Sequence, residues 1–298
     1  MCRDEQTRYM IQVDELQVFR GKDFVVNEYL SIEQKTLDEI CDFGEKEYFG
    51  YVSTFCSTPS DLIVEFEQSG IDFMKISDWE FFTSYGIYRS FGKKIGDFMF
   101  KGFDFTKLLP FKDEDDKINL VGYPYYEGTD SDGNHYLLSP DDYNEYGDET
   151  FKLKICGLDC DDIDSQIIFT EDDYIKASQY IRKTHKFRYN KLKPGNKNAR
   201  KMEVRLALRD RAKALARKDK SDLLDMISAM TNVEGFKYGW LDVWEMKINA
   251  FLDAVSRVQK IKNANLLLQS GYSGFGVDLS KLSSTEKEKS LNWLGSLD

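Results

Sequence analysis

The sequence predicts an α+β fold, with an N-terminal hairpin-plus-helix domain that carries an acidic β-rich insertion and with a helical C-terminal half. Runs of β-forming residues between turn residues indicate the strands. Ser/Thr-x-x-Glu capping sequences and apolar residues at helical spacing indicate the helices. We therefore expect an acidic α+β domain over residues 1–175, with the insertion near residues 103–169, and a helical domain over residues 176–298.

The first expected element is a β-hairpin. Two runs of β-forming residues, Leu16–Phe19 and Phe24–Val26, flank the turn sequence Arg20–Asp23. A capping box that starts at Thr36, in which a hydroxyl and a carboxylate satisfy each other's orphan amides, then predicts a helix towards Phe55.

Two more helices are expected before the insertion. Ser60 follows the helix-breaking Pro59 and is expected to cap a short helix that ends near Gly70. A second capping box, formed by Ser77 and Glu80, predicts the next helix.

Within the insertion, short apolar runs alternate with Gly, Pro, Asp and Asn, which indicates strands and turns. Asp130–Asn134 is expected to form a turn between strands at Tyr125–Tyr126 and Tyr136–Leu138. A calcium loop would use the same residues, but its first ligand position would fall on Gly128 and its twelfth on Ser139, so the turn is favoured.

Helices are predicted after the insertion. Caps are expected at Thr170, at Asn196 or Asn198 after the Pro194-Gly195 break, at Ser221 and at Thr285. The clearest periodicity has steps of four, three, four and three residues and predicts one face of an amphipathic helix, formed by Trp244, Ile248, Phe251, Val255 and Val258. A loop is expected over residues 271–276.

Charge is unevenly distributed along the chain. Residues 176–220, the basic arm, hold 17 Lys or Arg and three acidic residues, a local net charge of +14. The rest of the chain then holds 24 basic and 49 acidic residues, a net charge of −25. A polyanion, or an acidic protein surface, would be attracted to the arm.

Composition excludes a disordered or membrane-spanning chain. Apolar residues make up 41% of the sequence and aromatic residues 14%, so a core can be buried. There is no signal-peptide pattern and no apolar run long enough to cross a bilayer, so we expect a soluble protein made in a cytoplasm. The five cysteines form an odd set, which favours free thiols over disulfides.

No catalytic residue, cofactor or metal site is predicted. Cys156 and Cys160 would need two more soft or imidazole ligands to bind zinc. A second closely spaced cysteine pair is absent, and His135 and His185 are the only histidines that could be added, so zinc binding is not favoured. The glycines of residues 271–276 follow a helix instead of joining a strand to one, unlike a dinucleotide loop. The carboxylates of residues 161–173 are expected to form a solvated face, because perturbed carboxylates need burial.

The basic arm offers candidate polyanion-binding residues, which are Lys183, Lys186, Arg188, Lys191, Lys193, Lys197, Arg200 and Lys201. The remaining basic residues, from Arg205 to Lys220, are expected around several sides of one helix, and no known DNA-reading module is present. Pairing of the arm with acidic protein surface is therefore favoured over nucleic acid.

Two stretches of the chain resemble proteins encoded in the structural-gene region of tailed bacteriophages of Gram-positive hosts. The first comprises Glu39–Phe49, Thr58–Asp61, Gly70–Asp72 and Ile76–Glu80, and the second comprises Gly235–Gln259, Asn263–Ala264 and Leu268–Phe275. They cover under half of the chain, and no catalytic or binding residue carries over from the resemblance.

The resemblance implies a non-enzymatic tail assembly protein, either a tail assembly chaperone or a minor tail or virion component, which acts through protein–protein contacts. Implied partners are other phage structural proteins, such as the tape-measure protein or tail subunits, and further copies of the chain. The implied location is the host cytoplasm during assembly, and the virion if the protein stays in the particle. The alternative is a nucleic-acid-binding protein of phage replication or packaging that uses the basic arm.

Candidate partner-binding residues are exposed apolar side chains near the last helices, Trp240, Trp244 and Phe251. Ordinary core packing is the competing interpretation of all three, because large apolar side chains are more often buried.

Overall fold

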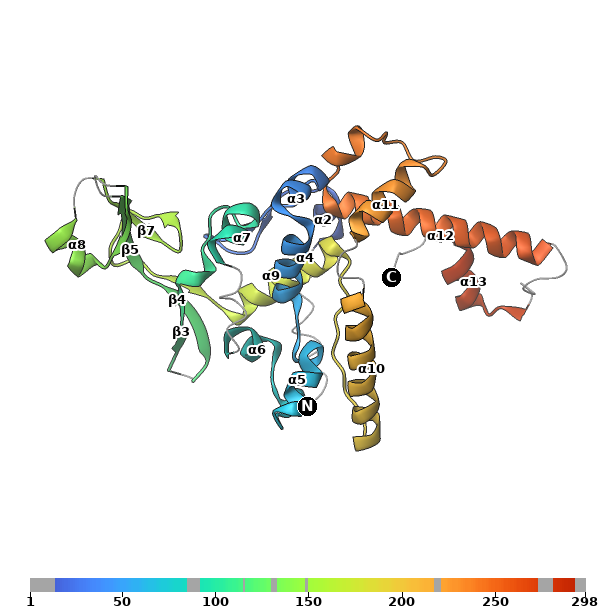
Figure 1. Ribbon diagram of the computed structural model, residues 1–298, viewed down its shortest axis with the longest axis horizontal. Coiled ribbons are helices and arrows are strands. Elements are labelled where there is room, and N and C mark those ends of the chain that lie inside the picture. The colour runs from blue at the N-terminus through green and yellow to red at the C-terminus, as the bar shows by residue number, and fades with distance from the viewer. Residues whose placement is uncertain are drawn as a thin grey trace. The chain divides into compact units, whose positions relative to one another are not determined.

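The computed structural model describes residues 14–84, 92–114, 116–129, 133–147, 150–216, 221–272 and 281–292. It confirms a mixed α+β fold with small antiparallel sheets and a helical C-terminal half (Figure 1). The chain divides into two compact units. Unit 1 comprises Met1–Lys35 and Glu39–Ser221, and unit 2 comprises Thr36–Asp38 and Asp222–Asp298.

The N-terminal hairpin lies later in the sequence than predicted. Residues Glu15–Phe19 form a short helix, α2, because the Asp14 side chain accepts a hydrogen bond from a backbone N–H of its first turn at 2.9 Å. The hairpin pairs β1 (Phe24–Val25) with β2 (Ser31–Ile32). Its turn is fixed by Asn27, whose side chain accepts from two backbone N–H groups at 3.0 and 2.8 Å. The strand prediction for residues 16–19 is therefore wrong.

Short helices follow the hairpin. The helix predicted from Thr36 towards Phe55 is two helices, because Gly44 takes a φ of +104° that favours glycine and separates them. The elements are α3 (Leu37–Phe43), α4 (Glu45–Cys56), η1 (Pro59–Leu62), α5 (Ile63–Gln68), η2 (Phe73–Lys75), α6 (Asp78–Ser84) and α7 (Gly92–Met99).

Two predicted caps have different outcomes. Ser77 caps α6 as predicted, since its Oγ accepts from the Glu80 N–H at 3.0 Å. The helical turn η1 is capped by Thr58 and not by Ser60, because Thr58 and Asp61 form a reciprocal capping box. Ser60 instead accepts a hydrogen bond from a distant part of the chain.

The insertion forms two antiparallel sheets, with strand orders β3-β4-β9 and β6-β5-β7-β8. The predicted hairpin between Tyr126 and Leu138 is confirmed as β5 paired with β6, while residues 130–132 of its turn lie outside the described residues. The elements are η4 (Phe105–Lys107), β3 (Leu108–Lys112), β4 (Ile118–Gly122), β5 (Pro124–Thr129), β6 (His135–Leu138), α8 (Pro140–Tyr146), β7 (Lys152–Ile155), β8 (Leu158–Asp159) and β9 (Ile167–Phe169).

Aromatic side chains fill the core of unit 1. The ring of Tyr174 lies 4.6 Å from that of Phe82 and 5.8 Å from that of Phe55, centroid to centroid. Trp79 joins this group and contacts Phe169 of β9, which links helices to the sheet. Burying these large rings supplies much of the hydrophobic stabilisation of unit 1.

Two more helices complete unit 1. Helix α9 (Glu171–His185) starts at the predicted cap Thr170, which forms a capping box with Asp173. Helix α10 (Lys197–Ala216) follows Asn196, whose side chain accepts from the Ala199 N–H at 2.9 Å. Helix α9 packs on α4 and α10 packs on α5 (Figure 1), so unit 1 continues past residue 175 to Ser221.

Unit 2 is helical and consists of α11 (Asp222–Thr231), η5 (Asp242–Glu245), α12 (Ile248–Tyr272) and α13 (Ser284–Leu291). Its core includes Ile227, Val243 and Ile248. Helix α13 packs on α12 (Figure 1). Thr36 forms an antiparallel bridge with Lys247, which joins the separate N-terminal segment to this unit.

Three predictions for unit 2 need correction. Trp244 lies in η5, before the helix that carries the rest of its predicted apolar face. Helix α12 continues to Tyr272, into the predicted loop, of which residues 273–276 lie outside the described residues. Helix α13 is capped by Ser283 with Glu286, and not by Thr285, because the Ser283 Oγ accepts from the Glu286 N–H at 3.2 Å.

Candidate functional site

Part of the basic arm is paired within unit 1. Arg200 donates to Glu67 at 2.7 Å and to Asp72 at 3.1 Å, and its guanidinium lies over the Phe73 ring. Arg211 donates to Glu65 at 2.6 Å. Acidic side chains on and next to α5 therefore hold one side of α10.

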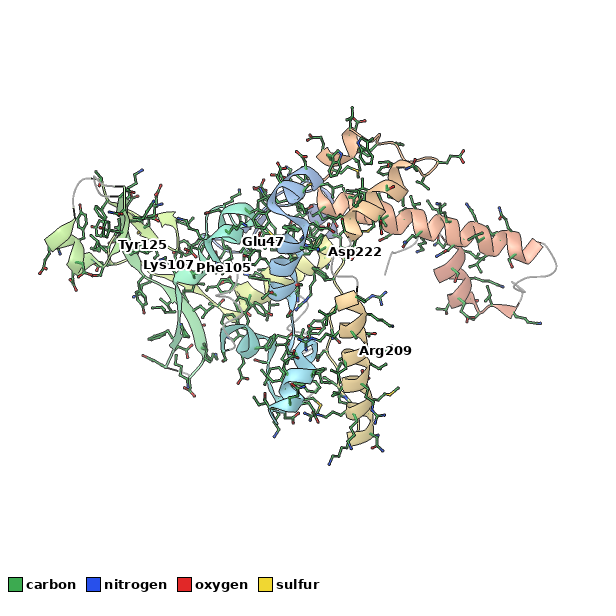
Figure 2. All side chains as sticks on the ribbon, viewed as in Figure 1. Glu47, Phe105, Lys107, Tyr125, Arg209 and Asp222 are labelled. Atoms are coloured by element: carbon green, nitrogen blue, oxygen red, sulfur yellow. The ribbon has the colours of Figure 1, made fainter. Side chains whose placement is uncertain are left out.

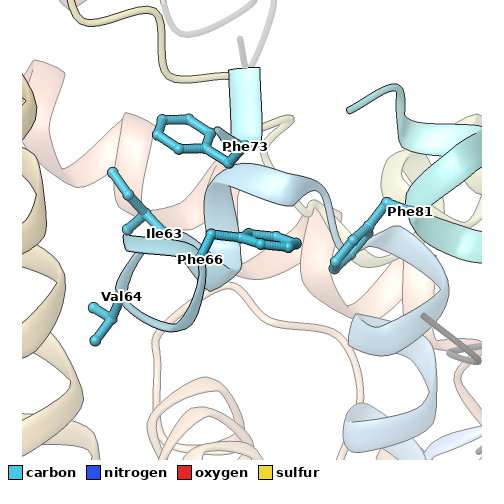
Figure 3. Packing of buried hydrophobic residues seen from close by; sticks show 5 residues of the cluster. All are labelled: Ile63, Val64, Phe66, Phe73 and Phe81. Atoms are coloured by element: carbon cyan, nitrogen blue, oxygen red, sulfur yellow. The ribbon is translucent and has the colours of Figure 1, made fainter. Parts of the chain in front are cut away.

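Apolar packing reinforces the attachment of α10. The side chains of Val204 and Ala207 pack against a cluster of buried residues beneath them. This cluster consists of Ile63, Val64, Phe66, Phe73 and Phe81 (Figure 3). Arg200, Val204, Ala207 and Arg211 recur at steps of four, three and four, so the packed and ion-paired residues share one face of the helix.

The segment between α9 and α10 is fastened to η1 by three hydrogen bonds. The Thr58 hydroxyl donates to the Asn190 carbonyl at 2.6 Å, and Asn190 donates to Asp61 at 2.8 Å. The Leu192 N–H donates to the Ser60 Oγ at 2.9 Å. Ser60, which the sequence predicts as a helix cap, thus holds the basic arm.

The opposite face of α10 carries a basic stripe, which we define as Lys201, Arg205, Arg209 and Lys213. All four are exposed and lie four residues apart, so they follow one another along the helix. Arg209, labelled in Figure 2, contacts Asp210 at 3.5 Å, and Lys213 contacts it at 3.6 Å. Arg211 lies on the packed face instead, so the basic residues of α10 from Arg205 onward lie on more than one side of the helix, and Arg217, Lys218 and Lys220 lie outside the described residues. The spacing of four that forms the stripe is visible in the sequence.

The eight candidate polyanion-binding residues divide in the structure. Arg200 is paired, Lys183 lies 3.7 Å from Glu15, and Lys186 ends α9 in a left-handed conformation. Lys191 is exposed. Four others are exposed and form no ion pair with any described residue, namely Arg188, Lys193, Lys197 and Lys201. The structure therefore pairs some of the eight with acidic side chains and leaves others exposed.

A second surface lies in unit 2, around Trp240. The Trp240 side chain is 55% exposed, and its neighbour Leu241 is 81% exposed. Trp244 is half-buried and meets Trp240 edge to face, with centroids 6.2 Å apart. Phe251 is fully buried in the core, so it is unsuitable for binding a partner. We call Tyr238, Trp240, Leu241 and Trp244 the tryptophan surface.

The nucleophilic and basic side chains of the core are poorly placed for chemistry. Burial raises the pKa of the Cys56 and Cys156 thiols to about 12, so neither is a thiolate near neutral pH. Burial lowers the pKa of His185 to about 4. Among the described residues, no three His, Cys, Asp or Glu side chains are grouped closely enough to hold a metal ion.

Within the described ranges, no helix combines the length and the apolar character that crossing a membrane requires.

Comparison with known proteins does not assign the chain to a family. The chain matches no protein-family model, no curated protein and no solved structure.

Proposed function

We propose that this chain is a non-enzymatic assembly protein that acts through protein–protein contacts. The setting implied by the sequence resemblance is the bacteriophage tail, where the chain would serve as a tail assembly chaperone or as a minor tail component. Its proposed partners are other structural proteins of the particle, such as the tape-measure protein or tail subunits. It would act in the host cytoplasm during assembly.

The tryptophan surface is the observation that carries this proposal. Trp and Tyr are enriched in protein interfaces, where a large ring enters a pocket of the partner and excludes water. Trp240 presents such a ring, and the half-buried Trp244 supports it from one side. An enzyme that acts on a small molecule does not need Trp240 and Leu241 to be exposed side by side, because the binding sites of small molecules are concave.

Affinity purification from cells that produce the particle tests this proposal. The tagged wild-type chain is expected to enrich structural proteins of the particle, identified by mass spectrometry, and the Trp240→Ser variant is expected to lose them. Leu266→Ser is the matched control, because Leu266 is also a large, 62% exposed apolar residue of unit 2. Equal enrichment by wild type and Trp240→Ser, or enrichment of replication proteins alone, would contradict the proposal.

Nucleic-acid binding remains the competing proposal, and the basic stripe is the observation that favours it. Four exposed cations along one helix face could contact phosphates. The acidic remainder of the chain, with a net charge of −25, opposes the approach of a polyanion. Measured affinity for an oligonucleotide that falls steeply with salt would support this alternative.

A further inference from the structure

The outward face of α10 is both basic and apolar. Met202 lies among the residues of the basic stripe, Leu208 lies at its edge three residues after Arg205, and Leu215 lies four residues after Arg211, towards the packed face. Each is about half exposed or more. A phosphate backbone offers no apolar surface to cover such side chains. An acidic protein surface with an apolar centre would satisfy both kinds of side chain at once.

The chain itself carries a surface of that kind on the β3-β4-β9 sheet. Leu109, Val121 and Ile168 are cross-strand neighbours in the register, and Phe111 lies two residues from Leu109, so all four share one sheet face. Leu109, Phe111 and Ile168 are each about half exposed, and Val121 is buried between its neighbours. We call this the outer sheet face.

The opposite face of the same sheet is covered along β4 and β9 and at Leu108 of β3, while Pro110 and Lys112 at the far end of β3 are exposed. Leu108, Leu120, Ile167 and Phe169 alternate with the residues of the outer face and are fully buried in the core of unit 1. An antiparallel sheet with one covered face usually presents polar side chains on the other. Apolar side chains on the outer sheet face therefore indicate a surface that a further element covers.

Acidic side chains lie at the ends of the strands that form the outer sheet face. Glu114 is exposed in the turn between β3 and β4, Asp164 is exposed just before β9, and Asp172 is exposed just after it. Residues 111–173 as a whole hold 19 acidic and four basic residues. The outer sheet face thus has the apolar centre and acidic rim that complement α10.

The two surfaces also match in length. The basic stripe, from Lys201 to Lys213, takes up thirteen residues, about 20 Å of helix. The five residues of β3 span about 17 Å of strand. A helix laid against one face of a sheet is a common way to bury both, and the charges at the rim would fix its orientation.

We propose that α10 of one copy binds the outer sheet face of a second copy of this chain. Within one copy both surfaces are exposed, so they do not cover each other. Each copy offers one α10 and one outer sheet face, and the interface is therefore heterologous: copies add head to tail and form a ring or an open chain. This inference does not rest on the tryptophan surface, which belongs to neither partner face.

Sedimentation velocity of the purified full-length chain tests the proposal. Wild type is expected to self-associate at low salt and to dissociate as salt increases, because rim charge pairs are screened. The double variant Arg205→Glu/Arg209→Glu is expected to weaken self-association roughly tenfold or more. Arg20→Glu/Lys22→Glu changes the net charge equally at exposed positions away from both surfaces and is expected to associate like wild type.

A second variant and a mixture make the test specific. Phe111→Glu/Ile168→Glu alters only the outer sheet face and is expected to weaken self-association to a similar extent. Mixed with Arg205→Glu/Arg209→Glu, it is expected to form a one-to-one dimer and nothing larger, because one intact α10 then meets one intact sheet face. Circular dichroism checks that both variants are folded, and milder changes, Arg209→Gln and Phe111→Ser, replace any that is not.

Three results would overturn the proposal. The first is a wild type that stays monomeric at low salt. The second is a mixture of the two folded variants that stays monomeric. The third is a wild type that binds a single-stranded oligonucleotide through Arg205 and Arg209 while the sheet variant behaves like wild type, which would assign the basic stripe to nucleic acid.

Discussion

The Tyr48 hydroxyl lies 2.6 Å from the Nε2 atom of His185 inside the core of unit 1. The other ring nitrogen, Nδ1, lies 2.8 Å from the Ile181 carbonyl, which can only accept, so Nδ1 carries the proton. Tyr48 then donates to Nε2, and His185 is held neutral. Both side chains are buried, and this contact links α4 to α9.

Stability is expected to fall between pH 7 and pH 5 because of His185. Burial lowers its pKa to about 4, below the ordinary value of 6.5. The unfolded chain therefore binds more protons than the folded chain in this range, and unfolding becomes easier as pH falls through 6.5 towards 4. The expected loss between pH 7 and pH 5 is about 2 kcal/mol in the free energy of urea unfolding.

His185→Gln is expected to flatten this pH dependence, and His135→Gln is the matched control because His135 is exposed. The pKa values of Glu47 and Glu127 are lowered mainly by hydrogen bonds from Lys94 and Lys154, so their contributions are lost only below the ordinary glutamate range. An unchanged slope in His185→Gln would assign the pH dependence to other groups.

Two glycines in helices are expected to respond to alanine in opposite directions. Gly96 lies in α7, where a Cβ would overlap the Phe103 carbonyl oxygen, so Gly96→Ala is expected to destabilise unit 1 by about 2 kcal/mol or more. Gly50 lies in α4 with open space around its Cα, so Gly50→Ala is expected to stabilise by about 0.5–1 kcal/mol. Thermal and urea unfolding measure both, and equal effects would contradict the close approach at Gly96.

The two faces of α10 are expected to differ in their effect on stability. Arg200→Ala removes a partly buried guanidinium that pairs with Glu67 and Asp72, and a loss of about 1–2 kcal/mol is expected. Arg205→Ala, on the outward face, is expected to change stability by less than about 0.5 kcal/mol. Urea unfolding of the two variants is the measurement, and an equal loss in both would show that α10 is not attached by its Arg200 face.

Residues of unit 2 proposed from the sequence are expected to separate into surface and core. Phe251→Ala should cost about 3–5 kcal/mol, because a fully buried ring leaves a cavity. Trp240→Ser should leave the unfolding free energy of unit 2 within about 0.5 kcal/mol of wild type. Hydrogen exchange of unit 2 amides measures both effects. Strong destabilisation by Trp240→Ser would show that Trp240 belongs to the core and not to the surface.

Local signals in the sequence predicted much of the fold. The capping residues Thr170, Ser77 and Asn196 act within one helical turn, so sequence spacing alone identifies them. The hairpin of β5 and β6 was predictable because turn residues separate two β-forming runs. Residues 16–19 were not, because the hydrogen bond that the Leu16 N–H donates to the Asp14 carboxylate outweighed the weak strand propensity of a short run.

The candidate surfaces depended on contacts between distant segments. The position of α5 determines which arginines of α10 form ion pairs, and the local sequence of α10 does not indicate that position. The sequence predicted Ser60 to be a helix cap. Its actual partner, Leu192, is far away in the sequence, so no local pattern indicates their hydrogen bond. Phe251 and Trp240 are both large apolar residues near a helix, and only the packing of unit 2 shows that one is core and the other surface.

Sedimentation velocity of the wild-type chain with a fluorescent single-stranded oligonucleotide at low salt tests the central claim, that this protein works through protein–protein contacts. We predict that the protein sediments as assemblies larger than a monomer while the oligonucleotide sediments freely. Oligonucleotide that co-sediments with a monomeric chain, and is released as salt rises, would contradict the claim and establish the basic stripe as a nucleic-acid surface.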